Sequence, residues 1–179
     1  MRVVLVGFRG VGKTAVAGAL ASKLGLEVVS TDREIENRSG SAIPVLVERY
    51  GWGPFREMEA SILGEAVLRE NIVLDTGGGI VLREDNCDLL KRCGFVVWLT
   101  APPNVIRERI GGSTHRPSLT GESSTLDEVE EVLGERNPLY REVSDFTIDT
   151  SGMEISRVVE EIAGILTRDQ PLGSSAPSR

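Results

Sequence analysis

Eight residues near the start of the chain have the types and spacing of a phosphate-binding loop. Residues 7–14, Gly-Phe-Arg-Gly-Val-Gly-Lys-Thr, match the pattern G-x-x-x-x-G-K-[ST] at every fixed position. The backbone N–H groups of such a loop, at the start of a helix, form a concave anion site that the helix dipole reinforces. Lys13 adds a positive charge for the β- and γ-phosphates, and the Thr14 hydroxyl is placed to ligate Mg²⁺. A glycine-rich turn that binds nothing is the simpler alternative, but such a turn needs neither the lysine nor the hydroxyl.

The sequence around this loop predicts the strand and the helix that it needs. Residues 2–6 form a short β-branched apolar run, and residues 15–24 carry apolar side chains at helical spacing. Four more strands are predicted, at residues 26–30, 71–75, 95–99 and 146–149. The other predicted helices cover residues 32–38, 42–50, 55–70, 83–93, 102–110, 126–143 and 153–167.

Turn and capping chemistry adds local detail. Ser41 is expected to cap the helix at 42–50, and residues 51–54, Gly-Trp-Gly-Pro, to break the chain before the next helix. Pro138 favours an interruption of the helix at 126–143, because the residue before a proline disfavours the α conformation. The apolar stripe of the helix at 55–70 leaves three charged residues outside it: Arg56, Glu57 and Glu59.

Five short strands that alternate with helices predict an α/β fold, a three-layer P-loop NTPase architecture with helices on both faces of a parallel sheet. We expect one domain over residues 1–167, with a lid at about 111–124 and a flexible tail at 168–179. Ligands of such sheets bind beyond the carboxyl ends of the strands. Those ends gather the phosphate loop, Asp32, Asp75, Gly77–Gly79 and the lid.

Length and composition limit the classes of function. A chain of 179 residues is long enough for one domain with a full core. The net charge of −7 argues against nucleic acid as a partner. No apolar run approaches the roughly 18 residues of a membrane span, and the first strand leaves no room for a signal sequence, so we expect a cytoplasmic protein without a membrane partner. Cys87 and Cys93 are expected to be reduced and structural, and a monomer is the default expectation.

A phosphate loop alone is compatible with a hydrolase, a switch, a kinase or a motor. Phosphoryl transfer to a small acceptor needs a group that takes the acceptor's proton, a way to hold the acceptor, and positive charge over the γ-phosphate with water excluded. Asp32 could accept a hydroxyl proton, and Arg56 and Arg136 could clamp an anionic acceptor. Arg116 in the lid could close over the phosphoryl group, and Gly77–Gly79 would let an acceptor approach the backbone closely.

These residues belong to a series of motifs that together resemble the shikimate kinases. The motifs follow the family's order and are the phosphate loop, Asp32 with Ile35-Glu36 behind it, Phe55-Arg56-Glu57, Thr76-Gly77-Gly78-Gly79, His115-Arg116-Pro117 and Arg136-Asn137-Pro138-Leu139-Tyr140. The resemblance implies a nucleoside-monophosphate-kinase-like fold with strand order 2-3-1-4-5. It also implies MgATP-dependent phosphorylation of the shikimate 3-hydroxyl, in the pathway to chorismate and the aromatic amino acids.

The resemblance also implies roles for individual residues. Lys13, Asp32 and Arg116 would be catalytic, with Asp32 as the general base and the two cations neutralising charge on the phosphoryl oxygens. The residues that would bind ATP are Gly10, Val11, Gly12, Lys13, Thr14, Ala15, Arg109 and Arg116, with Arg109 stacked on the adenine. The residues that would bind shikimate are Asp32, Arg56, Gly77, Gly78, Gly79 and Arg136, with the two arginines on its carboxylate.

At one position the sequence departs from the family pattern. The family's second strand usually ends in two aspartates separated by one residue, and the first helps to hold Mg²⁺ through water. That first position is Ser30 here, and a hydroxyl cannot supply the missing negative charge. Asp75 ends the third strand, where the family commonly has a small residue. Either Mg²⁺ is held by Thr14, phosphates and water alone, or Asp75 replaces the lost acid as a magnesium partner that acts through water. Thr14 and Asp75 are therefore the candidate metal-binding residues.

Simpler and rival interpretations stay open at this point. Asp32 could only cap a helix, Arg56 could pair with Glu59 on a solvated face, and Arg136 could form a surface ion pair. A kinase of another small hydroxy acid, such as gluconate, is the nearest rival function. The rivals from other classes are an ATP-binding regulatory module without transfer activity and a nucleic-acid-stimulated NTPase.

Overall fold

The structure, a computed structural model, describes residues 1–111 and 126–168. The predicted lid at 111–124, with His115 and Arg116, lies outside the described residues except for Gly111. Arg168, predicted as the first residue of the tail, is instead the last residue of the closing helix, α8 (Ile155–Arg168). The rest of the predicted tail lies outside the described residues.

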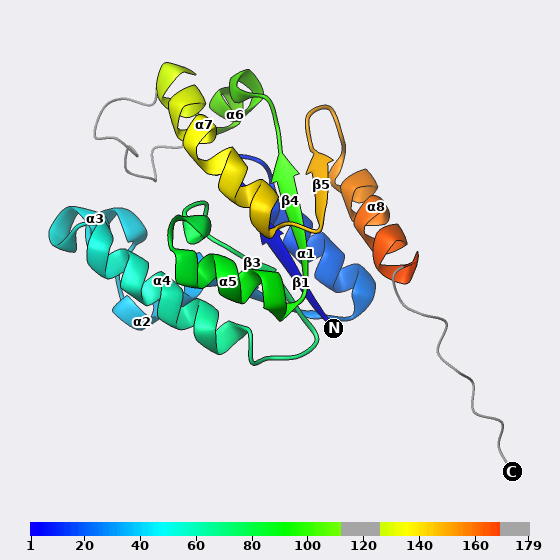
Figure 1. The fold of residues 1–179 in the computed structure, drawn as a ribbon, viewed down its shortest axis with the longest axis horizontal. Coiled ribbons are helices and arrows are strands. Elements are labelled where there is room, and N and C mark those ends of the chain that lie inside the picture. Colours follow the sequence, from blue (N-terminus) through cyan, green and yellow to red (C-terminus); the bar gives the residue numbers. More distant parts are fainter. Residues whose placement is uncertain (112–125, 169–179) are drawn as a thin grey trace, which may run out of the picture.

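In the described part of the chain, five parallel strands form one sheet. Their order, β2-β3-β1-β4-β5, confirms the α/β fold and the strand order that the family resemblance implied. Helices lie on both sides of the sheet (Figure 1). The central strand β1 is buried from Val3 to Val6, as expected for a parallel strand covered on both faces. The strands are β1 (Arg2–Val6), β2 (Glu27–Ser30), β3 (Ile72–Asp75), β4 (Phe95–Thr100) and β5 (Phe146–Asp149).

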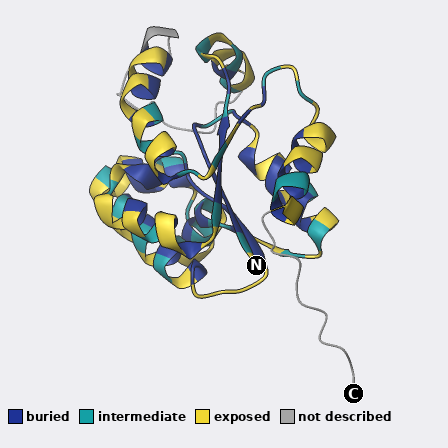
Figure 2. Cartoon of the chain, turned by 45° about the vertical axis from the view of Figure 1, so that its right-hand side comes forward, coloured by how far each residue is buried: buried dark blue, intermediate teal, exposed yellow. Residues whose placement is uncertain are grey.

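Helices cover both faces of this sheet, and their outer sides are exposed (Figure 2). Val3 and Leu5 of β1 face a core cluster shared with α1 and α8, whereas Val4 and Val6 face a cluster shared with α4 and α5. The alternation of side chains along β1 therefore builds three layers. The helices besides α8 are α1 (Lys13–Leu24), α2 (Thr31–Ser39), α3 (Ile43–Tyr50), α4 (Trp52–Ala66), α5 (Glu84–Cys93), α6 (Pro103–Ile110) and α7 (Leu126–Val143), with one 3₁₀ turn, η1 (Ile80–Leu82).

A third, smaller core cluster joins α2, α3 and α4 into a lobe, through residues that include Ile35, Leu46 and Phe55. α7 belongs to both main clusters, because Leu133 packs with the first and Tyr140 with the second. Both α4 and α7 contact η1, which follows β3. The lobe and α7 therefore meet at the segment that carries the three glycines.

The break predicted at residues 51–54 is a single residue long. α3 ends at Tyr50 and α4 begins at Trp52, so Gly51, with a φ of 79°, makes the whole turn. Pro54 lies in the first turn of α4, where a proline has no intrahelical hydrogen bond to lose. The prediction recognised the turn residues but extended the break into the helix.

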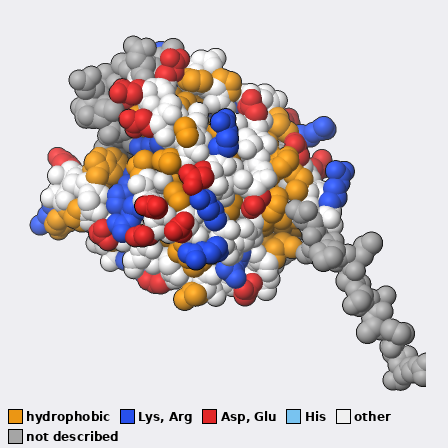
Figure 3. All heavy atoms as spheres, viewed as in Figure 1, with side chains coloured by type: hydrophobic (Ala, Val, Ile, Leu, Met, Phe, Trp, Pro, Cys, Tyr) orange, Lys and Arg blue, Asp and Glu red, His pale blue; other side chains and the backbone are white. Residues whose placement is uncertain are grey.

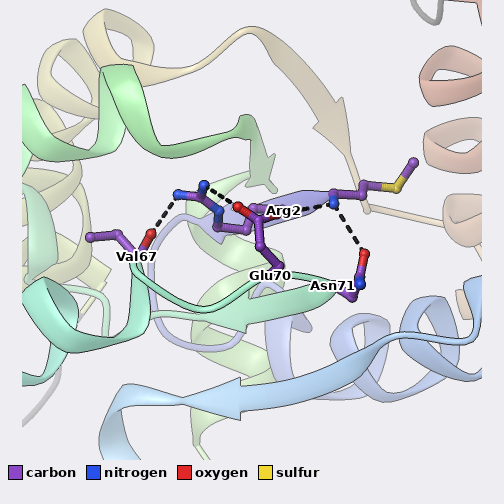
Figure 4. A network of polar contacts seen from close by, with 5 residues as sticks. Arg2, Val67, Glu70 and Asn71 are labelled. Carbon is purple, nitrogen blue, oxygen red and sulfur yellow. Dashed lines mark hydrogen bonds and ion pairs between the residues drawn. The ribbon is translucent and has the colours of Figure 1, made fainter.

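α4 ends at Ala66, four residues before its predicted end. Tertiary contacts determine this boundary (Figure 4). The Arg2 guanidinium donates to the Val67 carbonyl and to the Glu70 carboxylate, and the N-terminal amine donates to Asn71 Oδ1 at 3.1 Å. The first two residues of the chain therefore bind the segment 67–71 directly after α4.

Ser41 does not cap α3. Ala42 is the N-cap residue, without a side-chain hydrogen bond. The Ile43 N–H instead donates to Oε1 of Glu36, at 3.1 Å. A carboxylate from the preceding helix thus does the work that was assigned to the hydroxyl.

α7 continues through Pro138 without the predicted interruption. Arg136 and Tyr140, on either side of the proline, both donate to the carbonyl of Gly78. These contacts and the burial of Tyr140 outweigh the loss of one helical hydrogen bond.

None of the helices in residues 1–111 and 126–168 has the length and apolar character that crossing a bilayer requires. On the face seen in Figure 3, acidic and basic side chains are mixed rather than gathered into one broad area of a single sign. Cys87 and Cys93 are both buried and free, as predicted.

We predict that Leu20→Ala lowers the free energy of unfolding by about 2–5 kcal/mol, because Leu20 of α1 is fully buried and alanine leaves a cavity. Leu68→Ala is the control, since Leu68 is 81% exposed. It should change stability by no more than about 0.5 kcal/mol. Urea titrations followed by circular dichroism measure both changes, and equal losses would contradict the arrangement of the core.

Candidate active site

The phosphate loop connects β1 to α1 and surrounds the side chain of Lys13. The Lys13 Nζ donates to the carbonyls of Gly7 and Phe8, at 2.7 and 2.9 Å, and only 8% of Lys13 is exposed. Gly12 is the N-cap of α1, so the unpaired N–H groups of the first helical turn lie at the loop. A Cβ on Gly7 would lie 2.2 Å from the Leu99 carbonyl oxygen, so the loop can pass β4 only with glycine there. The result is an anion site with one enclosed cation.

Two neighbouring cavities lie at the carboxyl edge of the sheet. The larger, of about 370 Å³, is lined by Arg9, Gly10, Gly12, Lys13, Thr14, Ala15, Asp32, Asp75, Thr76 and Arg109. The smaller, of about 50 Å³, is lined by Arg9, Asp32, Ile43, Trp52, Phe55, Arg56, Glu59, Gly77, Gly78, Gly79 and Arg136. Asp32 and Arg9 line both cavities, so they mark the boundary between them.

Thr14 and Asp75 are in contact at the edge of the larger cavity. The Thr14 hydroxyl donates to Oδ2 of Asp75 at 2.8 Å, and only 4% of Asp75 is exposed. Asp75 is paired in register with Ser30 of β2. Hydroxyl and carboxylate oxygens are the hard donors that Mg²⁺ prefers, so the residues present fit this ion.

Arg109, near the end of α6, is fixed beside the phosphate loop. Its guanidinium donates to the hydroxyl and the carbonyl of Thr150, at 3.0 and 2.9 Å. The Thr150 hydroxyl in turn donates to the carbonyl of Val11 at 3.0 Å. An adjoining cavity of about 240 Å³ has a mainly apolar lining that includes Val16, Met153 and Val158, with Arg109 at its side. All the predicted nucleotide-binding residues except Arg116, which lies outside the described residues, are therefore brought together.

Arg56 and Glu59 of α4 form an ion pair in the wall of the smaller cavity. Arg56 Nη1 and Glu59 Oε2 are 2.5 Å apart, and the exposed fractions of the two side chains are 15% and 0%. The Arg56 guanidinium also lies over the rings of Trp52 and Phe55. The alternative in which Arg56 pairs with Glu59 on a solvated face was therefore right about the pair and wrong about the face. The prediction that Glu59 lies outside the buried side of the helix was also wrong.

The glycines after β3 approach charged side chains so closely that larger residues would displace them. A Cβ on Gly77 would lie 2.4 Å from Glu59 Oε1 and 2.8 Å from Asp32 Oδ1. A Cβ on Gly79 would lie 2.0 Å from Arg56 Nη2. The backbone itself is therefore part of the cavity wall.

Arg136 and Tyr140 of α7 hold the middle of this glycine segment. Arg136 Nη1 donates to the Gly78 carbonyl at 3.2 Å, and the Tyr140 hydroxyl donates to the same oxygen. Arg136 is 8% exposed, which rules out the surface ion pair considered for it. Tyr140 is fully buried beside Trp98, and burial raises the pKa of its hydroxyl, which keeps the proton that it donates.

Asp32 lies in the first turn of α2, not at its N-cap, which is Ser30. The capping alternative for Asp32 was therefore wrong. Arg9, Glu59 and Tyr140 belong to the site but were not among the predicted site residues. Arg9 stands at a variable position of the loop pattern, which carries no signal of its own. Glu59 and Tyr140 do carry one, because each follows a predicted arginine by three or four residues and so shares a face of its helix.

We predict that Glu59 makes the stability of the protein depend on pH. Burial raises the pKa of Glu59, an effect that the nearby Arg56 charge opposes without cancelling it. The folded state therefore binds a proton on the Glu59 carboxylate more tightly than the unfolded chain does, where the pKa of glutamate is about 4.3. The resulting stabilisation is complete below that value and is lost as the pH rises through the raised pKa of the folded state.

The measurement is the unfolding free energy of the wild type and of Glu59→Gln between pH 4 and pH 8. The difference, wild type minus variant, should grow as the pH falls. Glu65→Gln, on the same helix, is the control, because hydrogen bonding to Arg38 lowers the pKa of Glu65 and the difference should shrink at low pH. If the difference in unfolding free energy between the wild type and Glu59→Gln did not change with pH, the raised pKa of Glu59 would be contradicted.

Comparison with protein families and curated proteins relates most of the chain to one family. The family model described as shikimate kinase matches residues 9–167. A shikimate kinase of Nitratidesulfovibrio vulgaris is 40% identical over 168 residues, which are 92% of this chain and 95% of the relative. One from Nitrosococcus oceani is 42% identical over 161 residues, 89% of this chain and 84% of the relative.

Solved structures are similar over nearly all of the chain. The shikimate kinase of Acinetobacter baumannii in complex with shikimate has a TM-score of 0.90 at 35% identity and covers 95% of each chain. A gluconokinase of Sinorhizobium meliloti has a TM-score of 0.56 at 17% identity, a likeness that concerns the fold alone. The match to the family model and the identity to these curated relatives show that the chain belongs to the shikimate kinase family.

Proposed function

We propose that the chain transfers the γ-phosphoryl group of ATP to the 3-hydroxyl of shikimate and so forms shikimate 3-phosphate. The observation that carries this proposal is the position of Asp32 between an anion-binding cavity and a second cavity whose lining includes Arg56 and Arg136. Membership of the shikimate kinase family supports it, as does a related structure with shikimate bound. The gluconate alternative is supported by a shared fold only.

On the nucleotide side, the backbone of Gly10 to Ala15 and the Lys13 ammonium bind the phosphates of ATP. Arg109 lies against the base, in the apolar cavity beside the loop. Mg²⁺ accompanies the nucleotide and neutralises phosphate charge when it is bound; Thr14 would hold it. Arg116 adds a further positive charge at the transferring group, and its place in the site is a proposal from the sequence alone.

On the acceptor side, Arg56 and Arg136 bind the shikimate carboxylate, since guanidinium groups match a planar carboxylate with paired hydrogen bonds. The backbone of Gly77–Gly79 completes this wall. Asp32 takes the proton of the 3-hydroxyl while that oxygen forms its bond to the γ-phosphorus. The bond from the γ-phosphorus to the bridging oxygen of ADP breaks, and ADP leaves with the electron pair.

We propose a monomer that acts in the cytoplasm on two small molecules, without nucleic acid or membrane. The net charge of −7 and the mixed charges on the face seen in Figure 3 support the absence of nucleic acid as a partner. Gel filtration with light scattering measures the oligomeric state.

We predict that ADP release from MgATP, measured by a coupled assay, depends on shikimate and not on gluconate. Asp32→Asn should lower the turnover number by about 10²–10⁴-fold, because the acceptor proton loses its base. Asp85→Asn is the control, since Asp85 is an exposed carboxylate of α5 away from both cavities. ADP release that ignores the acceptor would mean that the chain is an ATPase or a switch.

We predict that Gly79→Ala weakens the acceptor side alone. The new Cβ would lie 2.0 Å from Arg56 Nη2 and has to displace the guanidinium. The KM for shikimate should rise about 10–100-fold, which corresponds to the loss of one charged hydrogen-bonded contact, with little change in the KM for ATP.

Gly164→Ala is the matched control for this substitution. Gly164 lies in α8 with open space where a Cβ would stand, so alanine should leave the kinetics unchanged and raise stability by about 0.5–1 kcal/mol. An unchanged KM for shikimate in Gly79→Ala would show that Arg56 does not bind the acceptor in this position.

A further inference from the structure

We propose that Asp75 supplies the protein carboxylate for the divalent cation of the bound nucleotide, and that β3 rather than β2 carries this charge in the present chain. The proposal rests on the proposed function, because it concerns the nucleotide that the same phosphate loop binds. It assigns a role to a residue for which the family resemblance offers none.

The contacts of Asp75 carry the first step. The Thr14 hydroxyl donates a hydrogen bond to Asp75 Oδ2, and the two oxygens are 2.8 Å apart. The lone pairs of the Thr14 oxygen take no part in this bond. Both residues line the cavity over the phosphate loop, together with Lys13. A hydroxyl oxygen and a carboxylate are thus held together at the place where the phosphates of a nucleotide enter.

The charge of Asp75 gives the second step. Only 4% of Asp75 is exposed, so water screens its negative charge poorly. This carboxylate and the phosphate groups of a nucleotide in the same cavity are both negative, and a divalent cation between them would reduce their repulsion beyond what Lys13 supplies. Mg²⁺ suits this position, because proteins commonly bind it through one or two carboxylates together with substrate phosphates.

The arrangement of the strand ends gives the third step. Ser30 of β2 is paired in register with Asp75 of β3, so an acid at either position starts from the same level of the sheet edge. Asp32 is the other carboxylate of the cavity, and its Oδ1 lies 2.8 Å from the position of a Cβ on Gly77, at the acceptor wall. The two carboxylates therefore have different roles. Asp75 lies beside Thr14, where the cation would bind, and Asp32 lies beside the acceptor wall.

The test measures metal-dependent nucleotide binding without any acceptor. The affinity for ADP is determined by calorimetry with and without Mn²⁺, and the bound Mn²⁺ is followed by electron paramagnetic resonance. In Asp75→Asn, the gain in ADP affinity that Mn²⁺ provides should fall by at least about tenfold. Affinity for metal-free ADP should stay equal or rise, because a negative charge has been removed from beside the phosphates.

Two further variants make the test specific. The double variant Ser30→Asp/Asp75→Ser returns a carboxylate from the neighbouring strand and should restore at least part of the Mn²⁺ effect, whereas Asp75→Ser alone should not. Asp149→Asn is the matched control, because Asp149 is an exposed aspartate that ends β5 at the same edge of the sheet, and it should behave as the wild type.

A full Mn²⁺ effect in Asp75→Asn would overturn the proposal. An equal loss of ADP affinity with and without Mn²⁺ would overturn it too, since Asp75 would then support the loop rather than the cation. Thermal unfolding of each variant confirms that it is folded. The wild type alone tests the proposed function. If that function is wrong, the wild type binds Mn²⁺ and ADP as expected but does not turn over shikimate.

Discussion

Lys13, Glu59, Asp75 and Arg136 are charged side chains that are almost completely buried around the two cavities, and the site depends on each having compensating partners. The phosphate loop encloses Lys13 with its own carbonyls. Glu59 is paired with Arg56, and Arg136 donates to a backbone carbonyl that a tyrosine also holds. These partners come from the phosphate loop, from α4 and from the glycine segment after β3, so the buried charges are compensated when these segments are packed against α1 and α7. The packing of these segments therefore also assembles the site.

The parallel sheet explains why the two cavities are neighbours. The carboxyl ends of β1, β2 and β3 lie side by side, and they deliver the phosphate loop, Asp32 and the glycine segment to one edge. α7 packs onto the glycine segment, where Arg136 and Tyr140 donate to the Gly78 carbonyl. Because Lys13 and Arg136 are almost completely buried, water screens their charges poorly, and their attraction for negative charge is stronger than in bulk solvent.

Much of this could be read from the sequence, where the signal is local. The strand–loop–helix start, the five strands and their alternation with helices all follow from short-range patterns, and the family resemblance added the strand order and most of the site. The failures depended on distant partners. Glu59 was misplaced because its burial is decided by the glycine segment and not by the apolar stripe of its own helix. Pro138 did not break α7 because contacts with Gly78 hold both sides of it, and Ser41 lost its capping role to Glu36 of the preceding helix.

A crystal structure of the protein with shikimate and ADP bound tests the central claim most directly, because it shows how the acceptor lies between the charged groups. The account predicts that the shikimate carboxylate accepts hydrogen bonds from Arg56 and Arg136. It also predicts that the 3-hydroxyl lies within hydrogen-bond distance of Asp32, on the side of the phosphate loop. A carboxylate bound elsewhere, or a 3-hydroxyl that points away from the phosphate loop, would contradict the account.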